Sequence, residues 1–248
     1  MQPIGDDIWH VPGEPLRMPG GMILPIAATV IRLPAGGLVV YSPVAFESGA
    51  GAAAGAAIDA LGPVEHVIVP SALHHLYAAA AAARWPAARI HAAAGARAKQ
   101  PALRVERDLA GGPDPAWQGA LDVVRIDGAP QLDEHVAFHR PSGTLICADL
   151  LFHITRPANF ATRVILALMG TGGGRLAQSR VWRFARRDLA AARASLARVL
   201  AWPIRQVAPC HGEPCPITAA ELAPRLARLA GARAAALALA PAGAAPAG

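Results

Sequence analysis

The first half of the chain alternates short β-branched runs with alanine-rich segments. Residues 29–33 and 38–41 are rich in Val, Ile and Leu and flank a Pro-Ala-Gly-Gly turn, which predicts a β-hairpin. The small residues of 47–63 predict a helix that ends at the Gly-Pro pair closing this stretch. A strand over 64–70 and a helix over 77–85 follow, so the pattern changes from strands to alternating strands and helices.

The second half repeats this change of pattern. Residues 121–127, 134–140 and 144–149 have the composition of strands, and a Pro-Ser-Gly turn joins the last two into a second hairpin. Residues 186–202 place apolar side chains on one helical face and arginines on the other, which predicts an amphipathic helix. A strand over 204–214 follows this helix.

These elements predict one domain over residues 1–232. A last helix begins at Thr218, where Glu221 completes a capping box, and ends near Gly231. Residues 233–248 contain mostly Ala, Pro and Gly and are predicted to be a disordered tail. Two halves with this order of strands and helices predict two sheets sandwiched between outer helices, a four-layer αββα architecture of the α/β class.

The composition is that of a globular protein with a full core. The 248 residues are 54% hydrophobic and 16% charged. Arg32 and Arg163 interrupt the best apolar runs before they reach the roughly 20 residues that span a bilayer. The acidic, proline-broken start is not typical of a secretory signal, and the three cysteines, Cys147, Cys210 and Cys215, fit a reducing compartment. The sequence therefore predicts a cytoplasmic protein without a membrane span.

The formal net charge of +6 raises the question of a nucleic-acid partner. Nearly all the cations are arginine, and aromatic residues make up only 5%, which leaves few stacking platforms, so we do not expect nucleic-acid binding. The charge suits an anionic small-molecule substrate equally well. Residues 169–180, "MGTGGGRLAQSR", resemble a phosphate loop but lack its lysine and a leading strand, and are interpreted as a flexible loop.

Metal-capable side chains follow three of the predicted strands. His74 and His75 come after strand 64–70, Asp149 ends strand 144–149, and His211 lies in the last strand. Loops that leave neighbouring strands can meet at one rim of a sheet. Imidazole nitrogen and carboxylate oxygen bind Zn²⁺ at about 2.0–2.2 Å, and bound water then becomes a nucleophile near neutral pH. Iron or manganese would accept the same ligands.

Each of these residues also has an ordinary structural interpretation. Consecutive helical residues point about 100° apart, so His74 and His75 bind one metal only if their segment is a loop. Otherwise one histidine caps the helix and the other packs. Asp149 could cap a turn. Glu213 could orient His211.

The remaining candidates are weaker. Glu134, at the mouth of its strand, is the best spare carboxylate for catalysis, and His153 could reach the rim that holds Asp149. His66 lies inside a strand pattern, and His10 and His91 stand alone. No GxSxG motif is present, so a serine hydrolase is not expected.

The sequence resembles the metallo-β-lactamase superfamily. The match runs from "TVIRLPAGGLVVYSPV" through "VEHVIVPSALHHLYAA" to "TLICADLLF" and "QVAPCHGEP". Asp149 matches the family's bridging aspartate and His211 its last histidine. The branch called domain of unknown function 4336 is the most similar, because an HH pair, a DLxF strand end and an HGEP loop recur there together.

The central motif departs from the family pattern. Where the family has THxHxDH, this chain has "PSALHHL", so Ser71 and Leu73 occupy the first two histidine positions. A shift of one residue places His74 and His75 over the Asp-His pair. The resemblance therefore implies that the site with three histidines is lost. A mononuclear site built from His74, His75, Asp149 and His211 could remain.

The resemblance implies a metal-dependent hydrolase that acts on an ester, amide or lactone bond of a small molecule. One divalent metal would be held there, with zinc as the first expectation and iron or manganese as alternatives. Asp149 and Glu134 are the expected catalytic carboxylates. Two other functions stay open: a non-catalytic binding module, which the loss of two ligands favours, and an iron-dependent redox or oxygen-handling protein. The oligomeric state stays open as well.

Overall fold

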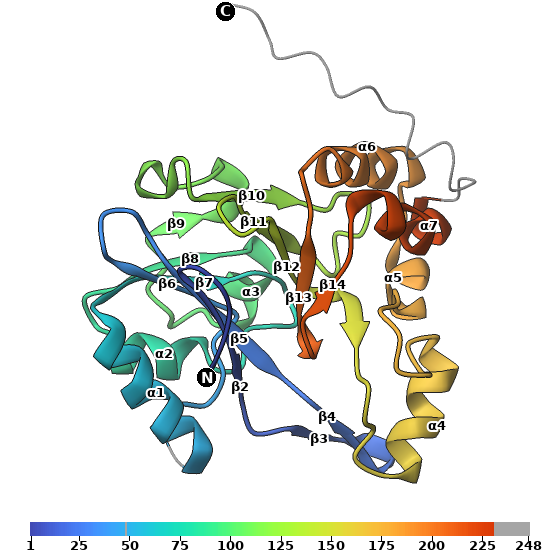
Figure 1. The fold of residues 1–248 in the computed structure, drawn as a ribbon, viewed down its shortest axis with the longest axis horizontal. Coiled ribbons are helices and arrows are strands. Elements are labelled where there is room, and N and C mark those ends of the chain that lie inside the picture. Colours follow the sequence, from blue (N-terminus) through green and yellow to red (C-terminus); the bar gives the residue numbers. More distant parts are fainter. Residues whose placement is uncertain (48, 231–248) are drawn as a thin grey trace, which may run out of the picture.

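The computed structural model describes residues 1–47 and 49–230 and contains two large β-sheets packed face to face (Figure 1). The first sheet has the strand order β1-β2-β5-β6-β7-β8-β9. Its strands are β1 (Gln2–Gly5), β2 (Ile8–Pro12), β5 (Ala27–Arg32), β6 (Leu38–Tyr41), β7 (Val64–Val69), β8 (Arg89–Ala92) and β9 (Arg107–Asp108).

The second sheet has the order β10-β11-β12-β13-β14, and a short ribbon β3-β4 extends from the first half of the chain. The strands are β10 (Leu121–Arg125), β11 (His135–His139), β12 (Thr144–His153), β13 (Gln206–Gly212) and β14 (Cys215–Pro216), and the ribbon strands are β3 (Leu16–Met18) and β4 (Met22–Leu24). Strands β12 and β13 run parallel, which brings their carboxyl ends to one edge.

Helices cover both outer faces of this pair of sheets (Figure 1). The first sheet carries α1 (Gly49–Leu61), α2 (Ala78–Arg84) and α3 (Ala94–Lys99). The second sheet is covered by α5 (Arg180–Ala185), α6 (Leu189–Leu200) and α7 (Ala219–Ala230), while α4 (Phe160–Met169) packs on the β3-β4 ribbon. The predicted four-layer αββα sandwich is therefore confirmed.

The alternation of side chains along each strand produces three apolar layers. In β7, Val67 and Val69 face the helices, whereas Ile68 faces the other sheet, because successive strand residues point to opposite faces. Ile68, Tyr41 and Ile146 meet in the layer between the sheets. Both faces of the central strands are buried, which explains their near-continuous runs of Val, Ile and Leu.

Several predicted elements are confirmed, and the structure adds helix α4, which was not predicted. The hairpins at β5-β6 and β11-β12 form antiparallel pairs as expected. Residues 169–180, interpreted as a loop, connect helices α4 and α5. The residues before this loop, to which the sequence assigned no element, form α4. Asn159 caps it by accepting a hydrogen bond from the backbone N–H of Thr162 at 2.7 Å. The predicted tail, residues 233–248, lies outside the described residues.

Strand β12 extends past its predicted end at Asp149 to His153, with an irregularity in its pairing to β13 between Cys147 and Phe152. Asp149 therefore lies within a bulged strand and not in a loop beyond it. Within the described ranges, 1–47 and 49–230, no helix is both long enough and apolar enough to cross a membrane.

Candidate metal centre

Three of the predicted ligands meet at one edge of the sandwich. His74 comes from the turn after β7, Asp149 from the bulge in β12, and His211 from the end of β13. The Nε2 atom of His74 lies 3.4 Å from Oδ2 of Asp149, and Nε2 of His211 lies 3.3 Å from Oδ1. All three ligand atoms lie within 4.8 Å of one another, so one small cation can contact all of them.

Gly212 lets β13 approach β12 closely enough for this arrangement. Its φ of +110° is in the region that favours glycine, and a Cβ there would overlap the backbone carbonyl of His153. Because Gly212 directly follows His211, the close strand contact fixes where this imidazole sits. The His211 ring also stacks on Phe152 with a centroid distance of 4.7 Å.

Hydrogen bonds to Nδ1 orient both imidazoles. Nδ1 of His211 donates to the backbone carbonyl of Pro25 at 2.9 Å, which leaves a lone pair on Nε2. Nδ1 of His74 is hydrogen-bonded to the Ser42 hydroxyl at 2.7 Å. Such contacts to the far ring nitrogen are typical of metal-ligating histidines, because they fix the ring and its tautomer. Both Nε2 atoms consequently point at Asp149.

The carboxylate of Asp149 is ionised and incompletely hydrogen-bonded, so it is suited to bind a cation. Burial alone would raise the pKa of Asp149, but the charge interactions with His74 and His211 hold it well below its usual range. Its Oδ2 atom is buried and has no hydrogen-bond partner among the described residues. Two imidazole nitrogens and one carboxylate match the three-ligand set of a catalytic divalent metal with an open coordination position. The residues present therefore fit such a metal.

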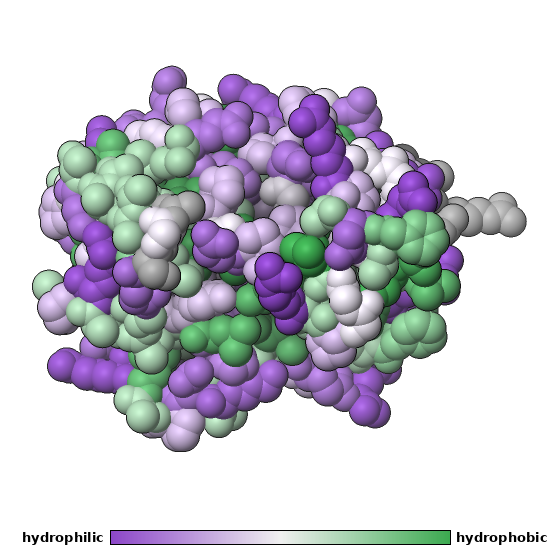
Figure 2. Space-filling model, turned by 90° about the horizontal axis from the view of Figure 1, so that it is seen from below, coloured by the Kyte–Doolittle hydropathy of each residue, from purple (hydrophilic) through white to green (hydrophobic). Residues whose placement is uncertain are grey.

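A cavity of about 230 Å³ opens above these three residues. Apolar side chains from the β3-β4 ribbon and from the turn after β7 form most of its wall, and Figure 2 shows hydrophobic side chains among polar ones on this lower face of the molecule. The apolar lining consists of Leu16, Met18, Leu24, Ile26, Pro43, Val44, Leu73, Leu76 and Tyr77. The cavity thus combines a polar base with walls that favour an apolar ligand.

The structure does not bring His75 into this group. Its Nδ1 lies 3.2 Å from the side-chain amide of Gln100, and burial, followed by the charges of Lys99 and His74, lowers its pKa. Residues 71–77 form turns before α2, so His74 and His75 point in different directions even without a helix. A role for His75 as a metal ligand stays a prediction.

Glu134 lies behind Asp149 and not on the cavity wall. Its side chain is fully buried, and Oε1 accepts hydrogen bonds from the backbone N–H groups of Ala148 at 2.9 Å and Leu150 at 3.1 Å. Oε2 accepts from the indole N–H of Trp182 at 2.9 Å. Burial and the neighbouring Asp149 charge raise the pKa of Glu134 to about 8. These contacts clamp both neighbours of Asp149 and are those of a positioning residue.

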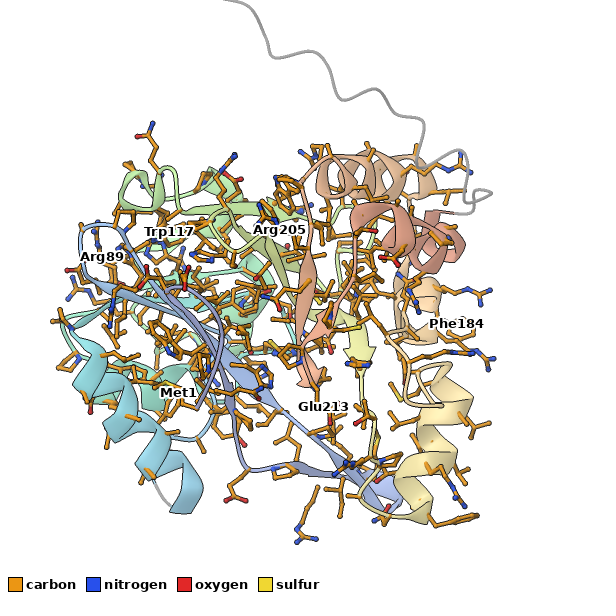
Figure 3. All side chains as sticks on the ribbon, viewed as in Figure 1. Met1, Arg89, Trp117, Phe184, Arg205 and Glu213 are labelled. Carbon is orange, nitrogen blue, oxygen red and sulfur yellow. The ribbon has the colours of Figure 1, made fainter. Side chains whose placement is uncertain are left out.

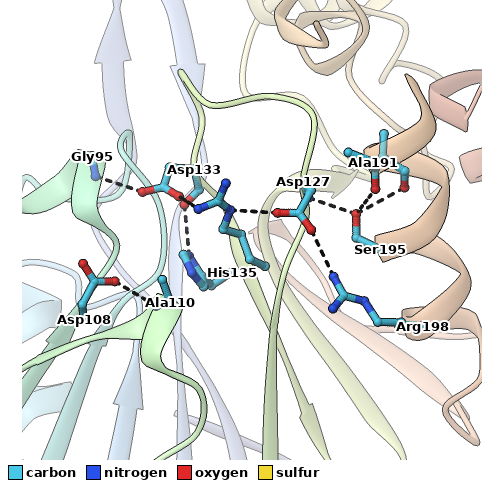
Figure 4. Close-up of polar contacts among 11 residues, drawn as sticks. Gly95, Asp108, Ala110, Asp127, Asp133, His135, Ala191, Ser195 and Arg198 are labelled. Atoms are coloured by element: carbon cyan, nitrogen blue, oxygen red, sulfur yellow. Dashed lines mark hydrogen bonds and ion pairs between the residues drawn. The ribbon is translucent and has the colours of Figure 1, made fainter. Parts of the chain in front are cut away.

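Polar contacts hold the loop that leads into Glu134 (Figure 4). Asp133 accepts a hydrogen bond from the backbone N–H of Gly95 at 2.9 Å, which ties the loop to α3. The backbone N–H of Asp127 donates to Ser195 on α6 at 2.9 Å, and Arg198 pairs with the Asp127 carboxylate at 3.1 Å. The loop is therefore fixed to helices on both outer faces of the sandwich.

The other candidate side chains near this edge have different partners. Glu213 accepts hydrogen bonds from the backbone N–H and the hydroxyl of Thr155, both at 3.1 Å, so it does not orient His211. Nδ1 of His153 donates to the backbone carbonyl of Glu213 at 2.8 Å. Pro25, which sequence reasoning did not consider, provides the acceptor for His211 instead.

A second polar cluster lies between the sheets on the opposite side of the molecule. His66 Nδ1 and His91 Nε2 are 2.9 Å apart, and both rings pack against Trp117, which Figure 3 labels near Arg89. Asp114 completes the group, with ligand atoms again within 4.8 Å. The Asp114 carboxylate already lies 3.6 Å from the Arg89 guanidinium and 3.8 Å from that of Arg107, and these two cations balance its charge. The isolation expected for His91 is therefore wrong, because the neighbouring strands β7 and β8 bring it beside His66.

Comparison with known proteins agrees with the fold. Residues 8–98 match the family model described as a domain of unknown function, DUF4336. Among solved structures, a metallo-β-lactamase from Pontibacter korlensis has 14% identity and a TM-score of 0.62, covering 92% of this chain and 97% of that one. The DIM-1 metallo-β-lactamase exposed to ceftazidime has 12% identity and a TM-score of 0.63, covering 93% and 94%.

The mono-zinc form of the metallo-β-lactamase FIM-1 from Pseudomonas aeruginosa is also similar, with 16% identity, a TM-score of 0.59 and coverage of 96% and 95%. No curated protein matches the chain by sequence. The chain has the metallo-β-lactamase fold and is related to the DUF4336 family, which confirms the resemblance found in the sequence.

Proposed function

We propose that this chain is a metal-dependent hydrolase with a single metal held by His74, Asp149 and His211. The main support is the convergence of two imidazole Nε2 atoms on the carboxylate of Asp149, whose buried Oδ2 has no hydrogen-bond partner among the described residues. When bound, a divalent metal of the zinc type supplies a water whose pKa is lowered toward neutrality. Zinc is the first expectation, because the solved relatives include a mono-zinc form.

The chain's own residues would bind and place the substrate. The apolar wall contributed by Leu24, Val44 and Leu76 would hold the uncharged part of a small ester, amide or lactone above the base of the cavity. Among the described residues, no lysine or arginine lines this cavity, so the predicted preference for anionic substrates finds no support in its wall.

The ligand assignment predicts a specific pattern of metal contents. The full chain purified without chelator is expected to hold one metal per chain by elemental analysis, and His211→Ala and Asp149→Ala are expected to lose it. His75→Ala is expected to keep it, because His75 is held by Gln100. A metal-free protein whose thermal stability ignores EDTA would contradict the proposal. Loss of metal in His75→Ala would instead support the four-ligand site predicted from the sequence, with His75 as the fourth ligand.

Activity separates this proposal from its two alternatives. Hydrolysis of a panel of short esters and lactones that disappears in His211→Ala supports the hydrolase. Leu73, which is 42% exposed and lines the cavity, specifically favours a non-catalytic binding module, because it cannot ligate a metal. Metal-loaded chain without turnover of any such substrate would favour that module. An absorption spectrum of fresh protein identifies an iron site, since zinc is colourless.

The hydrogen bond between the Ser42 hydroxyl and Nδ1 of His74 predicts a measurable contribution to metal affinity. Ser42→Ala removes the partner of Nδ1 and frees the ring to rotate, so we expect zinc affinity to fall by about 10- to 100-fold. Competition with a chromophoric chelator measures this change. Ser142→Ala is a matched control, because it removes a similar 2.8 Å contact to His139 at the turn before β12. Equal zinc affinities in the two variants would contradict the role given to Ser42.

A further inference from the structure

A second hollow, of about 570 Å³, lies between α4, α5, α7 and the loop that joins α4 to α5. The glycine cluster that resembles a phosphate loop in the sequence forms part of its wall, through Gly170, Gly172 and Gly173. It shares no lining residue with the cavity of the metal centre. Four arginines surround it: Arg175, Arg180, Arg183 and Arg225.

The wall of this hollow carries positive charge and, among the described residues, no acidic side chain. None of its four arginines forms an ion pair with an acidic residue in the described part of the chain. Elsewhere arginines do find such partners, for example Arg84 with Asp59 at 2.6 Å. Clustered cations without counter-ions inside a concave wall create a field that attracts anions.

Two of the arginines are anchored by the backbone. Nη1 of Arg180 donates to the carbonyl of Leu168, and Nη1 of Arg225 donates to the carbonyl of Leu176, both at 2.9 Å. Each guanidinium keeps further N–H groups for a ligand, since the group has five donors. Anchoring lowers the entropy lost when an anion binds.

Neutral donors in the same wall also lack partners. The side-chain nitrogen and oxygen of Gln178 are buried and form no hydrogen bond with any described residue. Within residues 1–47 and 49–230, nothing accepts a hydrogen bond from the backbone N–H of Gly172 or Gly173. An unpaired buried amide is costly, and its position at this wall makes the Gln178 side chain available to a ligand.

We propose that this hollow binds the phosphate group of an anionic ligand. Planar guanidinium groups bind phosphate oxygens through paired hydrogen bonds, and glycine backbone N–H groups add donors without steric obstruction. The volume exceeds that of one phosphate and leaves room for the organic part of a phosphate ester. This site goes beyond the proposed hydrolase, and neither depends on the other.

Two sources of phosphate have the required chemistry. A soluble phosphate ester could occupy the hollow alone. A phospholipid headgroup is the other source, because large apolar side chains stand exposed next to the lining residues: Leu168 on α4 is 67% exposed and Phe184 on α5 is 86% exposed. Figure 3 labels Phe184 on the outer side of α5. Such side chains can enter the acyl region of a bilayer beside bound headgroups.

Calorimetric titration of the full chain with inorganic pyrophosphate tests the soluble source. Arg175→Gln combined with Arg183→Gln is expected to raise the dissociation constant at least tenfold, while metal content stays unchanged. The matched control, Arg97→Gln with Arg205→Gln, removes the same charge outside the hollow and is expected to change binding less than twofold. Equal weakening in both double variants would show that only net charge attracts the anion and would overturn the site.

Flotation with phosphatidylcholine vesicles, with and without phosphatidylglycerol, tests the headgroup source. Binding that needs the anionic lipid and is lost in the Arg175 and Arg183 double variant assigns the hollow to a headgroup. Pyrophosphate binding without vesicle binding assigns it to a soluble ester. If neither pyrophosphate at millimolar concentration nor anionic vesicles bind in a way that depends on these arginines, the proposal is wrong.

Discussion

Replacing Glu134 by alanine is expected to lower the free energy of unfolding by about 3 kcal/mol or more. The substitution removes the acceptor of three N–H groups, those of Ala148, Leu150 and the Trp182 indole. Each buried donor left unpaired costs about 1–3 kcal/mol, and the missing side chain adds a cavity. Urea denaturation followed by circular dichroism measures the change through the shift in the transition midpoint.

Glu134→Gln, a milder substitution, separates the effect of the Glu134 hydrogen bonds from the effect of lost side-chain volume. Glu134→Gln keeps one oxygen for the two backbone donors but turns an amide N–H₂ toward the indole N–H of Trp182, so two donors face each other. Trp182→Phe in the same chain removes that conflict. We expect the double variant to be more stable than the sum of the two single effects predicts. Strictly additive effects would show that the Glu134–Trp182 contact contributes nothing.

The same clamp connects stability to the metal centre. Ala148 and Leu150 flank Asp149, so the segment that carries the ligand is held at both sides by a residue without access to the cavity. Loss of Glu134 is therefore expected to weaken metal binding as well as folding. The sequence predicted a catalytic role for Glu134, but its side chain points into the buried layer between β11, β12 and α5 and does not reach the cavity.

The sequence contained enough information to predict that Asp149 and His211 meet. Both follow apolar runs that can only be buried strands, and the ends of neighbouring strands share an edge. The runs of Val and Ile in β5, β6 and β7 likewise determine the first sheet. These predictions succeed because burial on both faces demands a continuous apolar pattern that few other structures tolerate.

The partners of each ligand could not be predicted in this way. The carbonyl of Pro25 lies 186 positions from His211 in the chain, and its backbone oxygen has no sequence signature. Ser42 did carry a usable signal, because a polar residue directly follows the buried strand β6. Its φ of +53°, unusual for serine, is visible only in the structure.

The choice between His74 and His75 depends on torsion angles within a turn. Both have the same side chain and adjacent positions, yet Ser42 orients one and Gln100 holds the other. Local propensity does not distinguish them, because their partners come from the residues directly after β6 and α3. Local sequence also does not show which strands become neighbours, so His66 and His91, which lie in different strands, seemed unrelated in the sequence.

Acid is expected to destabilise this protein between about pH 6.5 and pH 4, because several of its histidines are buried. Burial lowers the pKa of His10, His91 and His139 from 6.5 to about 4, and that of His66 is also lowered. The unfolded chain takes up protons at these imidazoles below about pH 6.5, whereas the folded chain does not until about pH 4. The stability they contribute is therefore complete above pH 6.5 and is lost as the pH falls to 4.

Each such histidine contributes a slope of up to about 1.4 kcal/mol per pH unit in this window, so several together can exceed the whole stability of an ordinary domain. Urea denaturation of the metal-free chain at intervals from pH 7.5 to 4.5 measures the slope without interference from metal loss. His139→Gln removes one imidazole that binds a proton on unfolding, so it is expected to reduce the slope of stability against pH by the contribution of one histidine. The matched control, His153→Gln, replaces a half-exposed imidazole at the surface and is expected to leave it unchanged. Stability that stays flat down to pH 4.5 would mean that the buried imidazoles do not resist protonation, because only a difference in proton binding between the two states produces a slope.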